Sequence, residues 1–223
     1  MSETWGLDLA TMRWKAMPAL LSARRSHVCC AVRGALVVLG GWVPGVGVSQ
    51  VHGTAPTSRV ERLSKGAGAF VELSPLPCGT IYNTAAIAVD ETYSASGQVL
   101  LLGGRAEDFT ATSSVRLVDL ATGVCTPQAD LLNTRSYFAA ARLLDGAIVC
   151  AGGGVACAEM WGASVKGALE AAWMWRELPA MSVGRSGCSG RVLSDGRFAV
   201  LGGFSTGGCT SSCEALTLGD DEH

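Results

Sequence analysis

Short apolar runs flanked by glycines recur four times along this chain. They read GALVVLGG, GQVLLLGG, GAIVCAGG and GRFAVLGG, and they begin at positions 34, 97, 146 and 196. Each has one glycine, five mostly apolar residues and a glycine pair. Five residues are too few for a core helix, and the β-branched members favour a strand that is buried on both faces. This repetition predicts a repeat protein made of β-strands.

A second strand is expected directly before each of these runs. The preceding residues are also apolar, as in YFAAARLL, and Asp145-Gly146 and Asp195-Gly196 are signals of a tight hairpin turn. The glycine pair then ends the second strand, because a residue without a side chain permits positive φ and close approach of another backbone. Each unit is therefore expected to contain an apolar hairpin.

The residues around the hairpins repeat as well. An apolar residue and a proline precede three hairpins, and the tetrapeptide at 8–11 recurs unchanged at 119–122, followed by Trp14 in the first copy and Cys125 in the second. The second unit has Ile81-Tyr82-Asn83 where the other units have an Arg-Ser dipeptide. Those dipeptides begin at Arg25, Arg135 and Arg185. The predicted order is hairpin, glycine pair, loop, third strand, fourth strand, proline turn and the next hairpin.

This order resembles the Kelch repeat, over nearly the whole chain. The resemblance implies an all-β fold, a Kelch-type β-propeller of about four blades, in which each blade is a four-stranded antiparallel sheet. We expect one domain, 1–223, with an N-terminal outer strand at 1–18 and successive blades at 19–76, 77–128, 129–178 and 179–223.

The two ends of the chain leave two arrangements open. The start, LDLATMRW, is typical of the end of a third strand followed by a fourth, and the final stretch, SCEALTLGDDEH, is typical of a third strand alone. The strand around Arg13 to Met17 is therefore a candidate to pair with the strand ending near Leu218 and close a four-blade ring, which would remove exposed sheet edges. The alternative is an open fragment of a larger propeller.

Composition and charge exclude several classes of protein. Hydrophobic residues make up 48% of the chain and charged residues 16%, which argues against disorder. Net charge is -2 and no basic run is present, so nucleic acid is not an expected partner. The longest uncharged stretch, 34–58, contains six glycines and two prolines, so no membrane span is expected. Glu3 and Asp8 argue against a signal peptide.

The chain has nine cysteines, an odd number, without a C-x-x-C motif. Several lie inside apolar runs, where cysteine behaves as a small hydrophobic residue. Free, reduced thiols are therefore expected, which is typical of a cytoplasmic or nuclear protein.

No catalytic motif is found, and the chain is predicted not to be an enzyme and to need no cofactor. There is no phosphate-binding G-x4-GK[ST] loop and no G-x-S-x-G nucleophile elbow. The alternative, by resemblance, is a sugar-active or copper-dependent enzyme like galactose oxidase, or a carbohydrate-binding propeller. Three histidines and three tyrosines, scattered over different units, offer poor material for its metal centre.

The expected function is protein binding. In Kelch propellers, the turns before the first strand and the loops after the second strand meet at one mouth of the ring, and mixed arginines and aromatics are typical of interface hot spots. The resemblance thereby implies a scaffold that binds a partner protein carrying an acidic or phosphorylated segment, as in the recognition part of a ubiquitin ligase. The competing interpretation is that the repeated arginines only brace loops. The candidate residues are Arg25, Arg135, Arg185, Trp42, Arg105 and Phe204.

Overall fold

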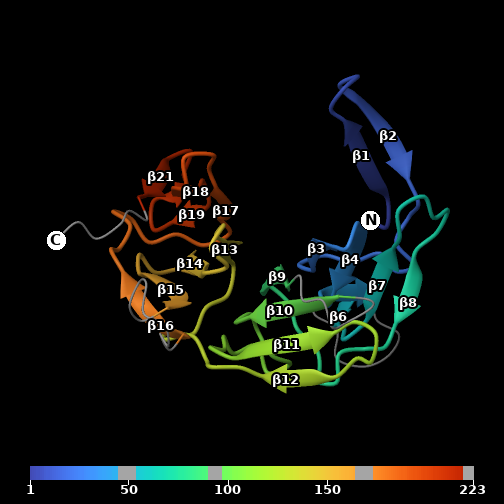
Figure 1. Ribbon diagram of the computed structural model, residues 1–223, viewed down its shortest axis with the longest axis horizontal. Helices are drawn as coiled ribbons and strands as arrows, with labels where there is room; N and C mark the ends of the chain where they lie inside the picture. The colour runs from blue at the N-terminus through green and yellow to red at the C-terminus, as the bar shows by residue number, and fades with distance from the viewer. Residues whose placement is uncertain (45–53, 90–96, 164–172, 218–223) are drawn as a thin grey trace.

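The chain folds into β-sheets that are arranged as the blades of a four-blade propeller (Figure 1). The computed structural model describes residues 1–44, 54–89, 97–163 and 173–217, and none of these residues lies in a helix. The all-β expectation is therefore confirmed. Among the described residues, no helix has the length and apolar character needed to cross a bilayer.

Among the residues that the structure describes, three blades have four antiparallel strands and the fourth has three. The first blade contains β3 (Val28–Val32), β4 (Ala35–Leu39), β7 (Val60–Leu63) and β8 (Val71–Leu73). The second contains β9 (Ala85–Val89), β10 (Gln98–Leu102), β11 (Val115–Asp119) and β12 (Cys125–Pro127). The third contains β13 (Phe138–Arg142), β14 (Ile148–Gly152), β15 (Ala158–Ala163) and β16 (Trp173–Leu178). The fourth contains β17 (Ser189–Val192), β18 (Phe198–Leu201) and β21 (Cys213–Leu216).

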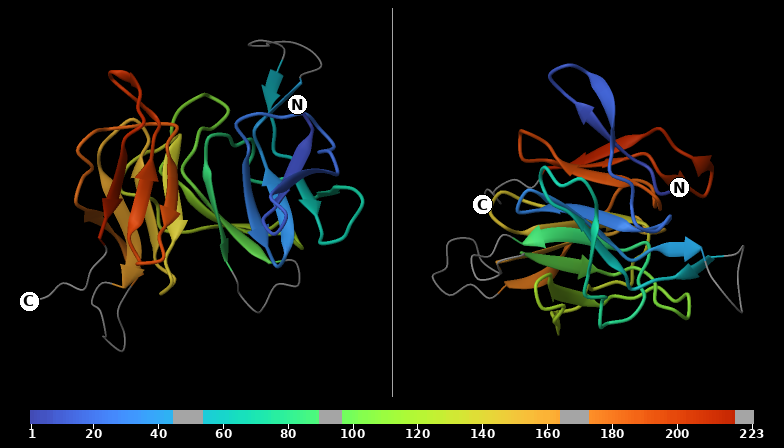
Figure 2. Two further views of the ribbon diagram at one scale, coloured as in Figure 1. Left: turned by 90° about the horizontal axis from the view of Figure 1, so that it is seen from above. Right: turned by 90° about the vertical axis from the view of Figure 1, so that its right-hand side faces the viewer.

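Three smaller hairpins complete the fold. β1 (Thr4–Asp8) pairs with β2 (Arg13–Met17) ahead of the first blade. Two others lie between the second and third strands of the first and fourth blades, and both extend from the same side of the molecule (Figure 2, left). These are β5 (Trp42–Pro44) with β6 (Thr54–Pro56), and β19 (Phe204–Ser205) with β20 (Gly208–Cys209).

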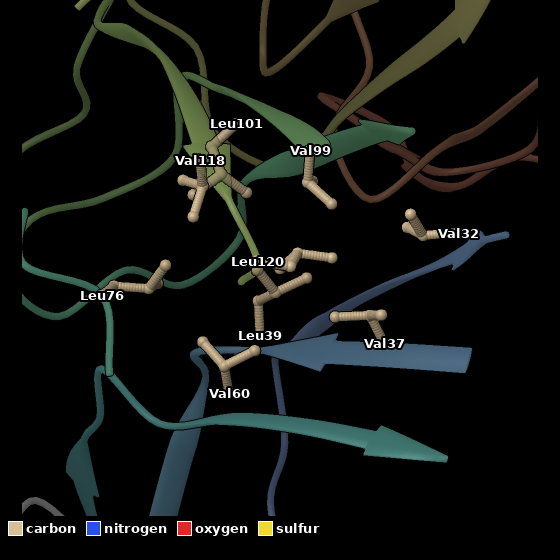
Figure 3. Packing of buried hydrophobic residues seen from close by; sticks show 9 residues of the cluster. All are labelled: Val32, Val37, Leu39, Val60, Leu76, Val99, Leu101, Val118 and Leu120. Atoms are coloured by element: carbon tan, nitrogen blue, oxygen red, sulfur yellow. The ribbon is translucent and has the colours of Figure 1, made fainter. Parts of the chain in front are cut away.

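The glycine-flanked runs form the second strand of each blade, and their apolar side chains make the core between blades. Leu101, Val149 and Val200 are 3%, 0% and 3% exposed, as the pattern predicts for strands with both faces covered. Figure 3 shows the core cluster between the first and second blades, in which Val37 and Leu39 of the first blade pack with Leu101 of the second. The burial explains why this chain tolerates so few charged residues.

The glycine pair of each of the first three blades joins that blade to the next one. The backbone N–H of Gly104 donates to the carbonyl oxygen of Arg135 at 2.7 Å, and Gly41 donates in the same way to Ile81 at 2.8 Å. At the preceding residue, Gly103, φ is +52° and an added Cβ would lie 2.6 Å from the Arg135 carbonyl oxygen. A side chain would therefore push neighbouring blades apart, which explains why the glycine pair repeats.

A line of backbone hydrogen bonds runs from blade to blade at the start of the innermost strands. The N–H of Asn83 donates to the Ser26 carbonyl, that of Tyr137 to Asn83, and that of Gly187 to Tyr137. All four residues have positive φ, from 54° at Asn83 to 63° at Gly187. This conformation, which side chains other than glycine seldom adopt, turns each chain segment into its first strand.

The turn of the N-terminal hairpin matches the turn between the third and fourth strands of the second blade, as the repeated tetrapeptide predicts. Asp8 Oδ1 accepts hydrogen bonds from the N–H groups of Ala10 and Thr11. Asp119 Oδ1 accepts the equivalent pair, from Ala121 and Thr122, at the turn between β11 and β12. The two Asp-Leu-Ala-Thr segments therefore form the same side-chain-stabilised turn.

Within the described part of the chain, the pairing that would close a four-blade ring is not formed. β2 pairs with β1 alone, and β21 pairs with β18 alone among the described residues. First strands of successive blades pack side by side, β3 on β9, β9 on β13 and β13 on β17, whereas β17 and β3 make no comparable contact. The blades consequently follow an open arc, with the first and fourth blades at its two ends (Figure 1). Leu218 lies outside the described residues.

All nine cysteines are free, in agreement with the sequence. Burial raises the pKa of the Cys30 thiol to about 12, so this thiol stays protonated at neutral pH. Cys150 is fully enclosed and burial raises its pKa further. Cys150 is therefore a core side chain, and Cys30 packs against the core.

Candidate loop-face binding site

The turns before the first strands and the loops after the second strands meet at one face of the propeller, here called the loop face. Isolated antiparallel bridges join the two sets of loops: Arg25 pairs with Trp42, Tyr82 with Arg105, and Ser186 with Phe204. These bridges lie at equivalent places in the first, second and fourth blades. The backbone therefore holds the residues after each glycine pair next to the residues that enter each hairpin.

Arg135 and Arg185, expected at this face, are instead buried inside their blades. Arg135 is 0% exposed; its Nε donates to Glu159 Oε1 at 2.5 Å and its Nη1 to the carbonyl of Gly152 at 2.6 Å. Arg185 is 1% exposed and makes the equivalent ion pair with Glu214, also at 2.5 Å. Neither guanidinium can reach a partner protein, so Arg135 and Arg185 are not part of the binding surface.

In the first blade, the arginine of this buried pair is Arg24 and not Arg25. Arg24 Nη2 pairs with Glu61, and its Nη1 donates to the carbonyl of Gly40 at 3.0 Å, as Arg135 does to Gly152. The Arg-Ser dipeptides suggest that Arg25 is the equivalent of Arg135 and Arg185. The residue that makes the equivalent buried contacts is the preceding one, Arg24. In the first and fourth blades, the buried arginine directly precedes the residue that forms the bridge to the loop after the second strand, which is Arg25 or Ser186.

The glutamates complete a brace that ties each loop to its blade. The second oxygen of Glu61 accepts the backbone N–H of Leu21 at 2.8 Å, and that of Glu159 accepts Leu132 at 2.6 Å. Glu214 accepts Ser182 at 2.6 Å; burial opposes its ionisation, but the hydrogen bonds from Ser182 and Arg185 lower its pKa below the ordinary value. Buried charges paired and hydrogen-bonded in this way hold the loop in place.

An aromatic cluster occupies the loop face between the first and second blades. The Trp42 ring lies 5.1 Å from Tyr82 and 5.8 Å from Phe109, measured between ring centroids. Trp42 and Tyr82 are buried, whereas Phe109 is 50% exposed. The exposed guanidinium of Arg25 lies 5.8 Å from the Trp42 ring centroid, within the range of a cation–π contact.

Arg105 and Phe204 also lie at the loop face. Arg105 is half-buried; its Nε donates to Ser136 Oγ at 3.3 Å and its Nη1 to the Phe109 carbonyl at 2.9 Å. Phe204 is 58% exposed beside Ser186 in the fourth blade. Sequence reasoning missed Phe109 and Tyr137, which is 46% exposed. A signal for Phe109 existed, because the short polar loop after a glycine pair contains one aromatic residue.

The described residues do not contain a group of three or more histidine, cysteine, aspartate or glutamate side chains placed to hold a metal ion. His52, Tyr93 and His223 lie outside the described residues. Fold and site together define a four-blade β-propeller whose loop face carries an aromatic cluster and two arginines. Compared with known proteins, the chain matches no family model and no curated protein.

Proposed function

We propose that this protein is a Kelch-type protein-interaction module that binds its partner through the loop face. The observation that carries the proposal is the cluster of Trp42, Tyr82 and Phe109 with Arg25 against the tryptophan. Interface hot spots are enriched in tryptophan, tyrosine and arginine, and they combine a packed centre with exposed edges. Here Trp42 and Tyr82 are the packed centre, and Phe109 is the exposed edge.

The charge at this face suits a partner segment that is acidic or phosphorylated. Arg25 lies against the buried Trp42 ring, and Arg105 donates to the carbonyl of the exposed Phe109, while the chain as a whole carries a net charge of -2. Arginine guanidinium groups bind carboxylates and phosphates through paired hydrogen bonds. By analogy with other proteins of this fold, we propose that the module is the recognition part of a larger assembly, such as a ubiquitin ligase in the cytoplasm or nucleus.

Selection of peptides from a random display library tests the proposal without a known partner. The purified protein is expected to enrich peptides with clustered aspartate or glutamate. Affinities of the enriched peptides for Arg25→Ala and Phe109→Ala are expected to fall about tenfold or more, since each variant removes a hot-spot side chain.

Arg197→Ala is the matched control. Arg197 is an exposed arginine in the turn before β18, on a hairpin away from the loop face, and it pairs only with the neighbouring Asp195 among the described residues. It should bind the peptides as the unmodified protein does. Peptides without acidic residues, or equal losses at Arg197 and Arg25, would contradict the proposed surface.

A further inference from the structure

The second blade lacks the buried brace that the other three share. Its residue equivalent to Arg135 is Ile81, whose carbonyl accepts from Gly41 just as the carbonyl of Arg135 accepts from Gly104. The glutamate is also replaced. In the third blade Glu159 lies directly across from Cys150, and at the same register of the second blade Arg116 lies across from Leu101.

This exchange opens a pocket and leaves a cation without a partner. A pocket of about 90 Å³ lies where a guanidinium fills the other blades, and Ile81, Thr80, Ser114, Arg105 and Arg116 line it. Arg116 is half-buried, and within the described part of the chain its side chain forms no ion pair and no hydrogen bond. The Thr80 hydroxyl oxygen is buried there without a hydrogen bond.

The described residues around Arg116 offer no internal counter-ion. None of the residues that line the pocket is acidic. The Cys78 thiol also lines the pocket, and burial raises its pKa to about 11 together with a hydrogen bond to Cys125, although Arg116 acts in the opposite sense. The thiol is therefore neutral at neutral pH. A charge taken partly out of water without a partner costs free energy that an anionic ligand would recover.

We propose that this pocket binds a carboxylate group, held by the Arg116 guanidinium and the Thr80 hydroxyl. One carboxylate accepts two guanidinium hydrogen bonds and a third from a hydroxyl, which matches the free donors. The pocket has room for one such group and lies beside the loop face, since Arg105 and Ala106 belong to both. The carboxylate comes either from a free organic acid or from an acidic side chain of a bound chain. The proposal does not depend on the partner surface.

Arginine side-chain NMR with acetate as the probe tests the site. The Arg116 Nε–Hε signal is expected to shift saturably with acetate, at constant ionic strength, while the signal of Arg197 stays in place. Chloride should have no such effect. An unmoved Arg116 signal, equal shifts at both arginines, or inorganic phosphate binding as tightly as acetate would overturn the proposal.

Capped tripeptides distinguish the two sources of the carboxylate. A Gly-Glu-Gly tripeptide is expected to shift Arg116, and the isosteric Gly-Gln-Gly tripeptide is not. If the glutamate peptide binds about tenfold more tightly than acetate, the natural source is an acidic side chain; equal affinity indicates a free acid. A response to the glutamine peptide equal to that of the glutamate peptide would count against the site.

Variants separate binding from stability. Arg116→Gln should weaken acetate binding about tenfold or more, and Arg116→Lys should retain part of it. The double variant I81R/R116E rebuilds the brace of the other blades, so it should melt at a higher temperature and should not bind acetate. Acetate binding to this variant is measured from the remaining arginine signals and from thermal stabilisation by acetate, and neither should change. Acetate stabilising this variant as much as the unmodified protein would refute the site.

Discussion

Replacing Arg135 with alanine is expected to lower the free energy of unfolding by about 3–5 kcal/mol. The substitution leaves the Glu159 carboxylate buried without its counter-ion, and it removes the donor to the Gly152 and Cys157 carbonyls. A broken buried ion pair costs this much because the remaining charge has neither water nor a partner. Urea denaturation followed by tryptophan fluorescence measures the effect.

A double variant shows whether the cost comes from the orphaned charge. Arg135→Met combined with Glu159→Leu removes both charges and keeps the volume filled, so its stability should lie well above that of Arg135→Ala. An Arg135→Ala variant as stable as the unmodified protein would show that the brace contributes nothing to the fold.

Leu39→Ala is expected to cost about 2–5 kcal/mol of stability. Leu39 is 0% exposed and fills the interface between the first and second blades, where the backbones are fixed by the inter-blade hydrogen bonds and cannot collapse onto a cavity (Figure 3). The same denaturation measurement applies, with Leu144→Ala as the control, because Leu144 is 98% exposed at a hairpin turn. Equal losses at the two leucines would contradict the assigned core.

The sequence predicted the repeated parts of the fold because the same local chemistry recurs in each blade. Glycine pairs are required where neighbouring backbones approach within hydrogen-bonding distance, and Asp8 and Asp119 form the same turn. These features depend on residues close in sequence. Ring closure is a different matter, since it depends on how two distant strands meet, and β21 has no partner for its outer edge among the described residues.

The candidate site was predicted in part. Trp42, Arg105 and Phe204 do lie in the loops after the glycine pairs, but the Arg-Ser dipeptide did not reveal which arginine turns inward. That choice depends on the register of a glutamate on the third strand, more than twenty residues further along the chain, as at Glu159. The pocket at Arg116 could not be predicted from the sequence for the same reason. Only the pairing of Arg116 with Leu101 shows that this arginine occupies the position of the glutamate in the other blades.

The neighbouring residues Arg24 and Arg25 test the central claim most directly, that buried arginines brace the blades while exposed ones bind. Each is replaced by alanine, and both variants are measured for urea stability and for affinity to the selected acidic peptides. Arg24→Ala should lose stability by about 3–5 kcal/mol, and Arg25→Ala should stay within about 0.5 kcal/mol of the unmodified protein. Under conditions where both are folded, Arg25→Ala should bind about tenfold more weakly. Unchanged binding in Arg25→Ala, or a loss of affinity without a loss of stability in Arg24→Ala, would contradict the account.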